Sequence, residues 1–554
     1  MRHGGKVVVD HLRANGVERV FSVPGESFLA ILDGLHGSGI ANIVCRHEGA
    51  AAMMAEATGK LTGRPGIALV TRGPGATNAA AGIHVASHDS TPMILLVGQI
   101  SRGHRDRGAF QEVDYRAFFG GLAKWVAEVD DTARLPEYLS RAFHVAVSGR
   151  PGPVVLSLPE DVLTAGVEVA DIAPPAPAVA AGVPVEAITG ALGRAQRPLV
   201  VVGGSRWSAQ AAADLASFVS AWDIPVAASF RRQGHFDNRV SHYAGDLGAG
   251  MNPALGRRLA QCDLLIALGC RISDMMTAGY SLIAPERQLP SLVHVHPDPD
   301  EPGRVFRPDA AITADPVAVA AALARTAPAA PCPWREWTRA ARAGYEDWTL
   351  PRRTPGAVRL EEVIAWLSDN LPEDAIVTNG AGNYAAFLHR YFRYKGWGTQ
   401  LAPTSGSMGY GFPAAVAASL AHPGRTVVCL AGDGCFQMTL NEMSTAMQHG
   451  AHPVVIVANN GIYGTIRMHQ ERHYPGRVSG TTMATPDFAA LARAYGAYGE
   501  RVGETSAFAG AFARARGSGR LAVIELALDP EAVSTGATLS AIRAAAGGGE
   551  PSPV

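Results

Sequence analysis

The sequence predicts an α/β protein with three consecutive doubly wound parallel-sheet domains. A chain of 554 residues is too long for one ordinary hydrophobic core, since a domain usually holds about 150 residues. Short apolar runs alternate, three times over, with Gly-rich or polar turns and helical stretches, as in parallel α/β layers. The runs consist almost entirely of Val, Ile and Leu, which indicates strands covered by helices on both faces.

Each domain is predicted from its own set of strand-like runs. These runs, with the turns that follow them, lie at residues 66–78, 92–99, 152–162, 197–204, 262–271, 291–300, 375–382, 426–434 and 453–461. Ala- and Pro-rich segments at 173–184 and 326–334 predict linkers. The predicted domains are therefore a first domain at 1–165, a central domain at 184–325, a third domain at 354–535 and a tail at 536–554.

Composition excludes several classes of protein. Hydrophobic residues make up 47% and charged residues 18%, which favours a globular chain. A net charge of -1 argues against nucleic-acid binding. The charged N-terminus and the short apolar runs argue against a signal peptide or a membrane span. The six cysteines lack metal-ligand spacing and are expected to be reduced, so we expect a soluble cytoplasmic protein with no nucleic-acid or membrane partner.

The most informative stretch combines a strand, a Gly-Asp-Gly turn, a helix, a second strand and Asn-Asn-Gly. The 24 residues between Gly434 and Asn459 suit one crossover helix. The apolar face of that helix would consist of Phe436, Leu440, Met443 and Met447. Because a right-handed crossover returns the second strand parallel to the first, Asp433 and Asn460 are expected at the same edge of the sheet.

This edge offers the oxygen ligands that Mg²⁺ prefers. A carboxylate from Asp433, an amide oxygen from Asn460 and the carbonyl of Ile462 could share the ion with phosphate oxygens. The glycines would let the backbone approach a phosphate, and the following helix would supply N–H donors. Either motif alone is more often a capping turn or a loop, but the two at this spacing favour a metal and diphosphate site.

In these residues the chain resembles thiamine diphosphate-dependent enzymes, whose fingerprint is Gly-Asp-Gly followed about two dozen residues later by Asn-Asn. The resemblance implies that Asp433, Asn460 and the Ile462 carbonyl bind Mg²⁺, which holds the diphosphate of the cofactor. Further contacts with the cofactor are implied for Gly432, Gly434, Cys435, Asn383 and Tyr384. Acetolactate synthase-like members often carry Gln-His at the last two positions.

A second group of residues would activate the cofactor. Glu48 follows a short strand and opens a helix rich in Ala and Met, where a carboxyl group loses hydration and shares a proton readily. The same position also suits a glutamate that only interacts with the helix dipole. The resemblance implies that Glu48 pairs with N1′ of the aminopyrimidine, that Met408 supports the folded rings, and that the Gly406 carbonyl accepts from the 4′-amino group. Met408 would otherwise be an ordinary core methionine.

The resemblance to acetolactate synthases covers essentially the whole chain, in the order pyrimidine-binding, central and diphosphate-binding domain. The AFQE sequence at 109–112 implies that Phe110 and Gln111 lie near the reacting centre, although a plain helix start has the same residues. Several positions depart from the pattern. Gly25 is followed by Glu26 and Ser27 instead of Gly-Gly, and Met275 replaces an arginine associated with substrate binding.

Another departure is His469, at the position of a tryptophan that favours a larger second oxo acid. A histidine there could donate or accept a proton near pH 7, or it could be a partly exposed surface residue. In the central domain, segments 201–207 and 269–274 fall where related enzymes hold FAD, and His296 stands where Asp is frequent. Other relatives hold another nucleotide there or nothing, so FAD remains one of three interpretations.

The predicted function is a Mg²⁺- and thiamine diphosphate-dependent carboligase, similar to acetolactate synthase, that decarboxylates a 2-oxo acid. The acceptor is left open. A simple 2-oxo acid decarboxylase and a non-catalytic nucleotide-binding regulatory subunit are the alternatives. In this family the counterparts of Glu48 and of Asp433 with Asn460 come from different subunits, which implies a homodimer or a dimer of dimers with shared active sites.

Overall fold

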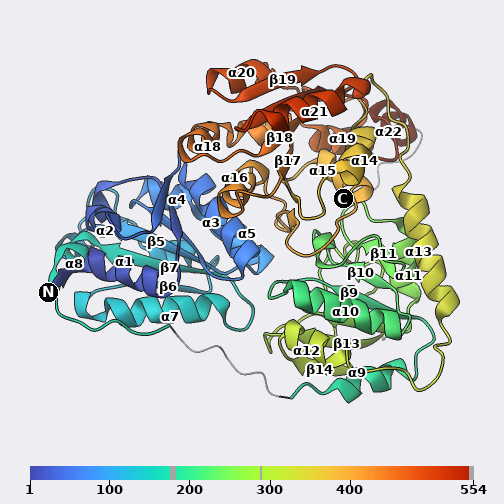
Figure 1. Cartoon of the computed structure of the whole chain (residues 1–554), viewed down its shortest axis with the longest axis horizontal. Helices are drawn as coiled ribbons and strands as arrows, with labels where there is room; N and C mark the ends of the chain where they lie inside the picture. The colour runs from blue at the N-terminus through green and yellow to red at the C-terminus, as the bar shows by residue number, and fades with distance from the viewer. Residues whose placement is uncertain (175–181, 287–289, 548–554) are drawn as a thin grey trace. The chain divides into compact units, whose positions relative to one another are not determined.

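The structure is a computed structural model that describes residues 1–174, 182–286 and 290–547. Parts of the predicted linker 173–184 and of the predicted tail 536–554 lie outside these residues. The described residues form three six-stranded sheets in which every strand pair is parallel, and a small two-stranded antiparallel sheet of β1 (Arg2–His3) and β8 (Gly166–Val167) (Figure 1). The prediction of three doubly wound parallel-sheet domains is confirmed.

The first sheet has the strand order β3-β2-β4-β5-β7-β6. Its strands are β2 (Arg19–Ser22), β3 (Ala41–Val44), β4 (Gly66–Val70), β5 (Met93–Gln99), β6 (Trp125–Glu128) and β7 (Pro153–Pro159). One face is covered by α1 (Gly4–Ala14), α2 (Leu29–Leu35) and α7 (Leu135–Val147), whose apolar residues share one core with the strands. Two further helices, α3 (Glu48–Thr62) and α5 (Ala80–Asp89), also pack against the sheet. The central strands β4, β5 and β7 are buried throughout, as continuous Val, Ile and Leu runs require.

The second sheet has the order β11-β10-β9-β12-β13-β14. Its strands are β9 (Pro198–Val202), β10 (Val226–Ala228), β11 (Tyr243–Asp246), β12 (Leu264–Leu268), β13 (Ser291–His296) and β14 (Ala310–Thr313). Two separate cores flank it. One contains α9 (Val185–Leu192), α10 (Ala209–Ala221) and α12 (Pro316–Leu323), and the other contains α11 (Pro253–Gln261) and part of α13 (Arg335–Thr349).

The third sheet has the order β16-β15-β17-β18-β20-β19. Its strands are β15 (Ile376–Asn379), β16 (Gln400–Leu401), β17 (Val427–Gly432), β18 (Val454–Asn459), β19 (Tyr498–Val502) and β20 (Ala522–Ala527). The strand order reverses between β15 and β17, because β16 lies on one side of β15 and all later strands lie on the other. In open α/β sheets such a switch point is where ligands bind, at the carboxyl ends of the strands.

The connection from β17 to β18 differs from the single helix that the sequence predicts. It consists of α17 (Asp433–Gln437), a 3₁₀ turn at Leu440–Glu442 and α18 (Met443–His449). Two buried polar groups explain the break: the Thr439 hydroxyl donates to the Gly409 carbonyl, and the Glu442 carboxylate accepts from the backbone N–H of Arg46. The prediction of one continuous helix is therefore wrong, although Phe436 and Met443 are buried as expected.

The chain divides into two compact units whose limits differ from the predicted domains. Unit 1 contains residues 1–179, 403–423 and 439–451, and unit 2 contains the remainder, with both the second and the third sheet. The reason lies in α16 (Gly411–Ala421), a helix of almost entirely apolar and small residues that packs against α3. Both helices carry a run of alanines, which allows their backbones to approach closely.

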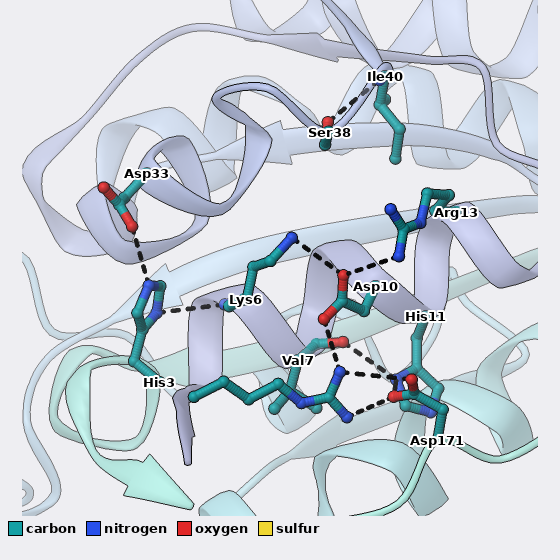
Figure 2. A network of polar contacts seen from close by, with 11 residues as sticks. His3, Lys6, Val7, Asp10, His11, Arg13, Asp33, Ser38, Ile40 and Asp171 are labelled. Carbon is teal, nitrogen blue, oxygen red and sulfur yellow. Dashed lines mark hydrogen bonds and ion pairs between the residues drawn. The ribbon is translucent and has the colours of Figure 1, made fainter.

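A polar network ties the end of the first domain to α1 (Figure 2). The Asp10 carboxylate forms ion pairs with Arg2, Lys6 and Arg13, and Arg2 also forms an ion pair with Asp171. The network lies in unit 1 and fixes the chain just before the predicted linker.

Two histidines, His3 at the N-cap of α1 and His11 in its last turn, add to this network. The ring of His11 is fully buried, and its Nε2 accepts from the backbone N–H of Ile172 at 3.2 Å. His3 caps α1 by accepting from the N–H of Lys6 and contacts Asp33 of α2 (Figure 2).

Part of the predicted tail is helical. Residues of α22 (Leu539–Ala546) pack against α19 (Gly464–His473), and Arg543 makes two hydrogen bonds, of 2.7 and 2.6 Å, to the carboxylate of Glu471. Glu471 is fully buried and also accepts from Arg467 at 3.0 Å. The Arg543 guanidinium, more than any other neighbour, lowers the pKa of Glu471 to about 2. Among the described residues, none of the helices has the length and apolar character needed to cross a membrane.

We predict that Glu471→Gln destabilises the protein by about 2 kcal/mol at pH 7, because it leaves two arginines without their carboxylate. A carboxyl group whose pKa is lower in the folded than in the unfolded state stabilises the fold above the unfolded pKa, and this contribution disappears as the pH falls toward the folded pKa. The wild-type protein should therefore lose stability between pH 4.5 and about 2, and the variant should lose less over that range. Urea unfolding at several pH values measures both effects.

Glu137→Gln, which breaks an exposed ion pair with Arg134, is the matched control. An equal loss of stability in both variants would contradict the prediction.

Candidate active site

The carboxyl ends of β17 and β18 bring together the two motifs that the sequence singled out. The strands are parallel, with Gly432 opposite Ala458, so Asp433 and Asn460 both follow their strands at the same edge. One oxygen of the Asp433 carboxylate accepts from the backbone N–H groups of Asn460 at 3.2 Å and Gly461 at 2.8 Å. The predicted proximity of Asp433 and Asn460 is therefore present in the structure.

The charge of Asp433 lacks a cationic partner in the part of the chain that the structure describes. The residue is 4% exposed, and none of the ion pairs among the described residues includes it. Burial raises the pKa of Asp433, while hydrogen bonds from the N–H groups of Gly434, Gly461 and Asn460 oppose this shift. A buried carboxylate with no counter-charge favours a bound cation, and hard oxygen ligands suit Mg²⁺.

The amide of Asn460 is also oriented by its own loop. Its Oδ1 accepts from the N–H of Ile462 at 3.2 Å, which curls the loop and brings the Ile462 backbone close to the amide. A Cβ at Gly464, the first residue of α19, would lie 3.3 Å from Asn460 Nδ2. The oxygen donors expected for Mg²⁺, from Asp433, Asn460 and Ile462, thus come from one short stretch of backbone beside the switch point. Among the described residues, no group of three or more His, Cys, Asp and Glu side chains forms a metal site.

The glycines of the turn leave room for side chains that cover it. A Cβ at Gly432 would lie 2.9 Å from a ring carbon of Tyr384, and one at Gly434 would lie 2.8 Å from a ring carbon of Tyr463. Both distances are too short for real side chains, so only glycine lets these rings pack on the turn. The predicted helix after the turn is α17, which has five residues.

The hydroxyl group of Tyr384 is engaged inside the protein. It accepts from the backbone N–H of Gly380 at 3.1 Å and donates to Sγ of Cys435 at 3.1 Å. Burial of the ring raises the pKa of Tyr384. Tyr384 therefore links the carboxyl end of β15 to the Gly-Asp-Gly turn, and contact of its hydroxyl with a diphosphate would require a change of partner.

Asn383 starts α15 (Asn383–Tyr391) and joins it to α19. Its Nδ2 donates to the carbonyl of Val533 at 2.6 Å, and its Oδ1 accepts from the hydroxyl of Thr465 at 2.9 Å. Next to this turn lies Asn379, at the end of β15, which the sequence analysis did not select. Its Oδ1 is buried and makes no hydrogen bond among the described residues.

Glu48 lies in unit 1 as the first residue of α3. Its Oε2 accepts from Asn78 Nδ2 at 3.0 Å, and a Cβ at Gly75 would lie 3.2 Å from its Oε1. The ring of His47, and not Glu48, caps the helix by accepting from the N–H of Gly49. Glu48 is half-buried in this single chain, less enclosed than its Ala-rich surroundings in the sequence predict.

Gly406 and Met408 also belong to unit 1. Gly406 has a φ of +70° and open space around its Cα, which suits a backbone that a ligand approaches. Met408 is half-buried, so it is neither a core methionine nor a fully exposed one. Its carbonyl accepts from the hydroxyl of Ser407 at 3.1 Å.

Gln111 occupies a strained backbone conformation in unit 1. Its φ of +65° falls in the left-handed region that residues other than glycine seldom adopt. A Cβ at Gly73 would lie 2.7 Å from Gln111 Cβ, and the N–H of Gly73 donates to the hydroxyl of Tyr115 at 2.8 Å. The neighbouring Phe110 is 74% exposed. Backbone strain beside an exposed aromatic ring is typical of a functional loop, and the AFQE segment is not a plain helix start.

His469 lies on the exposed side of α19. Its ring stacks against that of His473 with centroids 6.2 Å apart. Partial burial, and then the charges of Arg472 and His473, lower the pKa of His469 below its ordinary value. The geometry in the single chain matches the surface interpretation of the sequence as well as the catalytic one.

The central sheet has its own switch point, between β9 and β12. Gly204, with φ +77°, lies so close to Gly269 that a Cβ would be 1.8 Å from the Gly269 carbonyl oxygen. Burial lowers the pKa of His296 to about 4. Met275 is half-buried. These contacts describe a tightly closed pair of turns at the carboxyl ends of β9 and β12.

The chain matches three protein-family descriptions in order. Residues 2–118 match the thiamine pyrophosphate enzyme N-terminal TPP binding domain, residues 185–323 the central domain and residues 380–526 the C-terminal TPP binding domain. Thiamine pyrophosphate is the same compound as thiamine diphosphate. Each of the three sheets thus corresponds to one domain of a thiamine pyrophosphate enzyme.

Curated relatives match over nearly the full length. The chain is 32% identical to the acetolactate synthase isozyme 2 large subunit of Escherichia coli (strain K12) over 508 residues, covering 90% of this chain and 91% of that protein. It is 34% identical to the acetolactate synthase large subunit of Parasynechococcus marenigrum over 521 residues (90% and 83%). It is 32% identical to the acetolactate synthase large subunit of Corynebacterium glutamicum over 577 residues, covering 98% of this chain and 90% of that protein. The chain therefore belongs to the thiamine pyrophosphate enzymes, among the acetolactate synthase-like members, and the family implies thiamine diphosphate and Mg²⁺ as cofactors.

Because Gln111 is strained, we predict that Gln111→Gly is more stable than Gln111→Ala by about 1 kcal/mol. Glycine adopts a positive φ without the clash that a Cβ causes. Urea unfolding of the two variants measures the difference. At Arg116, an exposed residue in the helix at Tyr115–Phe119, the same pair should show the opposite sign, with alanine more stable. An alanine variant at position 111 as stable as the glycine variant would show that the loop carries no strain.

Proposed function

We propose that this chain is the catalytic subunit of a Mg²⁺- and thiamine diphosphate-dependent carboligase. It would decarboxylate a 2-oxo acid and join the remaining fragment to a carbonyl acceptor, in the manner of an acetolactate synthase. One observation carries the proposal: the buried Asp433 carboxylate, without a described counter-charge, hydrogen-bonds to the backbone of Asn460 and Gly461 at the carboxyl edge of two parallel strands.

The residues at this edge would hold the diphosphate end of the cofactor. Asp433, Asn460 and the Ile462 carbonyl are the proposed Mg²⁺ ligands, and Gly432 and Gly434 would bring the backbone of the turn close to the phosphates. Asn383 would orient the adjacent turn, because it already joins α15 to α19. When bound, thiamine diphosphate supplies the carbon nucleophile and the electron sink that decarboxylation requires.

Glu48 is the proposed proton-sharing group at the other end of the cofactor. Asn78 engages one carboxylate oxygen and leaves the other beside Gly75, so the carboxyl group is held in one orientation. The Gly406 carbonyl would accept a hydrogen bond from the pyrimidine, and Met408 would support the bend between the rings. Gln111, held in its strained conformation, would contact the substrate.

The identity of the acceptor depends on the positions that depart from the acetolactate synthase pattern. His469 and Met275 both replace residues associated with substrate recognition, so a second 2-oxo acid and an aldehyde are both candidates. Incubation with pyruvate followed by product analysis tests the proposal. Acetolactate or acetoin would support a carboligase, acetaldehyde alone would indicate a decarboxylase, and no Mg²⁺-dependent binding of thiamine diphosphate would indicate a regulatory subunit.

We further propose that a second copy of this chain completes the site, as a homodimer or a dimer of dimers. In unit 1 the exposed Phe110 adjoins Gln111, and in unit 2 the exposed Ile466 lies on the helix that follows Ile462. Met438 and Tyr474 are more than half exposed as well. A second copy that covered these side chains would remove their apolar surface from water. We also propose a cytoplasmic location, which is supported by the absence of a disulfide bond among the cysteines of the described residues.

We predict that Asp433→Asn weakens Mg²⁺-dependent binding of thiamine diphosphate on the order of 100-fold, because the ion loses its anionic ligand. Titration calorimetry with and without Mg²⁺ measures this change. Asp487→Asn is the control, since asparagine replaces aspartate well as the N-cap of α20 (Phe488–Ala494). Unchanged affinity in the Asp433 variant would remove this residue from the metal site.

Shared sites predict complementation between two inactive variants. Glu48→Gln and Asp433→Asn should each be inactive alone, but a mixed dimer would combine an intact Glu48 from one subunit with an intact Asp433 from the other. Random exchange of equal amounts should restore about a quarter of wild-type activity, because half of the dimers are mixed and each has one intact site. The experiment is refolding or co-expression of the two variants, followed by an assay of CO₂ release. Activity that stays at the level of the separate variants would contradict a shared site.

A further inference from the structure

A buried cluster of charged and polar residues in unit 1 lies outside the site described above. Glu56 and Lys60 come from α3, two and three turns after Glu48, and Asp89 ends α5. Both carboxylates are at most 1% exposed. Lys60 pairs with both: its Nζ lies 3.1 Å from Glu56, and it also forms an ion pair with Asp89. Two carboxylates and one ammonium group are thus enclosed in the protein interior.

Each carboxylate also holds one end of the segment 403–410. At the first end, Asp89 accepts from the backbone N–H of Thr404 at 2.6 Å and from the Thr404 hydroxyl. At the second end, Glu56 accepts from the hydroxyl of Tyr410 at 2.6 Å. Lys60 Nζ lies 3.3 Å from that hydroxyl and 5.0 Å from the centre of the Tyr410 ring. The segment is therefore attached to the cluster on both sides.

Between these two attachments lie residues 405–409, which include Gly406 and Met408. Within this stretch the Gly409 carbonyl accepts from the Thr439 hydroxyl at 2.9 Å. The N–H of Gly406 donates to the Pro403 carbonyl at 3.1 Å, and the hydroxyl of Ser405 is buried without a hydrogen bond among the described residues. The cluster thus fixes both ends of the stretch, and Thr439 holds Gly409 next to the second end.

Stability alone does not explain such a cluster. Removing charges from water is costly, and well-packed apolar residues of similar volume often serve a fold as well or better than a buried ion pair. Burial raises the pKa of Glu56 despite the nearby Lys60. What the cluster supplies is geometry, because charged hydrogen bonds fix the positions of two chain segments against α3.

We propose that Glu56, Lys60 and Asp89 form a buried clamp that holds the segment 403–410 against α3 and so positions Gly406 and Met408 for the pyrimidine half of the cofactor. Thr404 and Tyr410 are positioning residues, since each acts through the segment that it anchors. The inference rests on the proposed function, because it assumes that thiamine diphosphate is the ligand that Gly406 and Met408 meet.

Two ligands that share a diphosphate test the clamp. Thiamine diphosphate with Mg²⁺ requires both ends of the site, whereas inorganic pyrophosphate with Mg²⁺ requires only the Asp433 end. Tyr410→Phe and Thr404→Val each remove one hydroxyl from the clamp. We expect both variants to bind thiamine diphosphate about tenfold more weakly and to bind pyrophosphate within about twofold of the wild-type protein, as measured by titration calorimetry on the full chain.

Thr445→Val is the matched control. The Thr445 hydroxyl donates at 2.6 Å to the buried carboxylate of Glu442 and also contacts the Val44 carbonyl, both in the same unit and both outside segment 403–410. This variant should bind both ligands as the wild-type protein does, and thermal unfolding of all three variants reports any general loss of stability.

The outcomes separate the clamp from the proposed function. If the clamp variants lose affinity for both ligands equally, or if Thr445→Val shows the same selective loss, the clamp does not position the pyrimidine end. If both clamp variants bind thiamine diphosphate as tightly as the wild-type protein, the inference is also overturned. If the wild-type protein binds neither ligand in the presence of Mg²⁺, the proposed function itself is wrong.

Discussion

The hydrogen bonds from the backbone of Asn460 and Gly461 to the Asp433 carboxylate are the constraint on which the rest of the site depends. They form only because β17 and β18 run parallel, with Gly432 opposite Ala458, so that both strands end at the same level. A register shift of one residue would separate the two loops and turn every side chain of β18 to the opposite face of the sheet. The buried hydrophobic strands therefore determine where a polar, negatively charged group meets the oxygen-rich loop at the switch point of the sheet.

The other half of the site is organised by α3 rather than by a sheet. Its first residue is Glu48, and its later turns carry Glu56 and Lys60, which contact the segment before α16. One helix thus links the proposed proton-sharing carboxyl group to the loop that contains Gly406 and Met408. The regularity of the helix makes this link stiff, because residues in successive turns keep a fixed spacing along its axis.

Much of the fold could be predicted because its signals are local. Each of the apolar runs named in the sequence analysis contains a strand, since a buried parallel strand needs a continuous apolar stretch. The proximity of Asp433 and Asn460 followed from the handedness of one crossover. Features that depend on distant partners were missed. The break in that crossover is stabilised by Arg46 and Gly409, and α22 is held by Arg543 on Glu471, although its sequence looks like a frayed tail.

In the candidate site, too, features with a local signal were predicted and features that depend on distant partners were missed. Motif spacing selected Asp433, Asn460 and Glu48, but no local pattern indicated that Gln111 has a positive φ or that the Tyr384 hydroxyl contacts Cys435. Thr404 and Tyr410 were not selected, since their partners Asp89 and Glu56 lie far away in the sequence. Asn379 was not selected because the sequence does not show that its Oδ1 is buried without a hydrogen bond among the described residues. Glu56 and Lys60 lie four residues apart in the sequence of α3. Their burial, which makes the pair informative, can be seen only in the structure.

The discontinuous make-up of unit 1 has a consequence for biosynthesis. The alanine-rich side of α3 is covered by α16, which leaves the ribosome only after the whole intervening segment 180–402 has been translated. Until then the nascent first domain exposes an apolar helix surface and lacks two of its three chain segments. Domains usually fold as they emerge, but this one cannot finish until most of the polypeptide exists, so the growing chain exposes an aggregation-prone apolar surface for much of its synthesis.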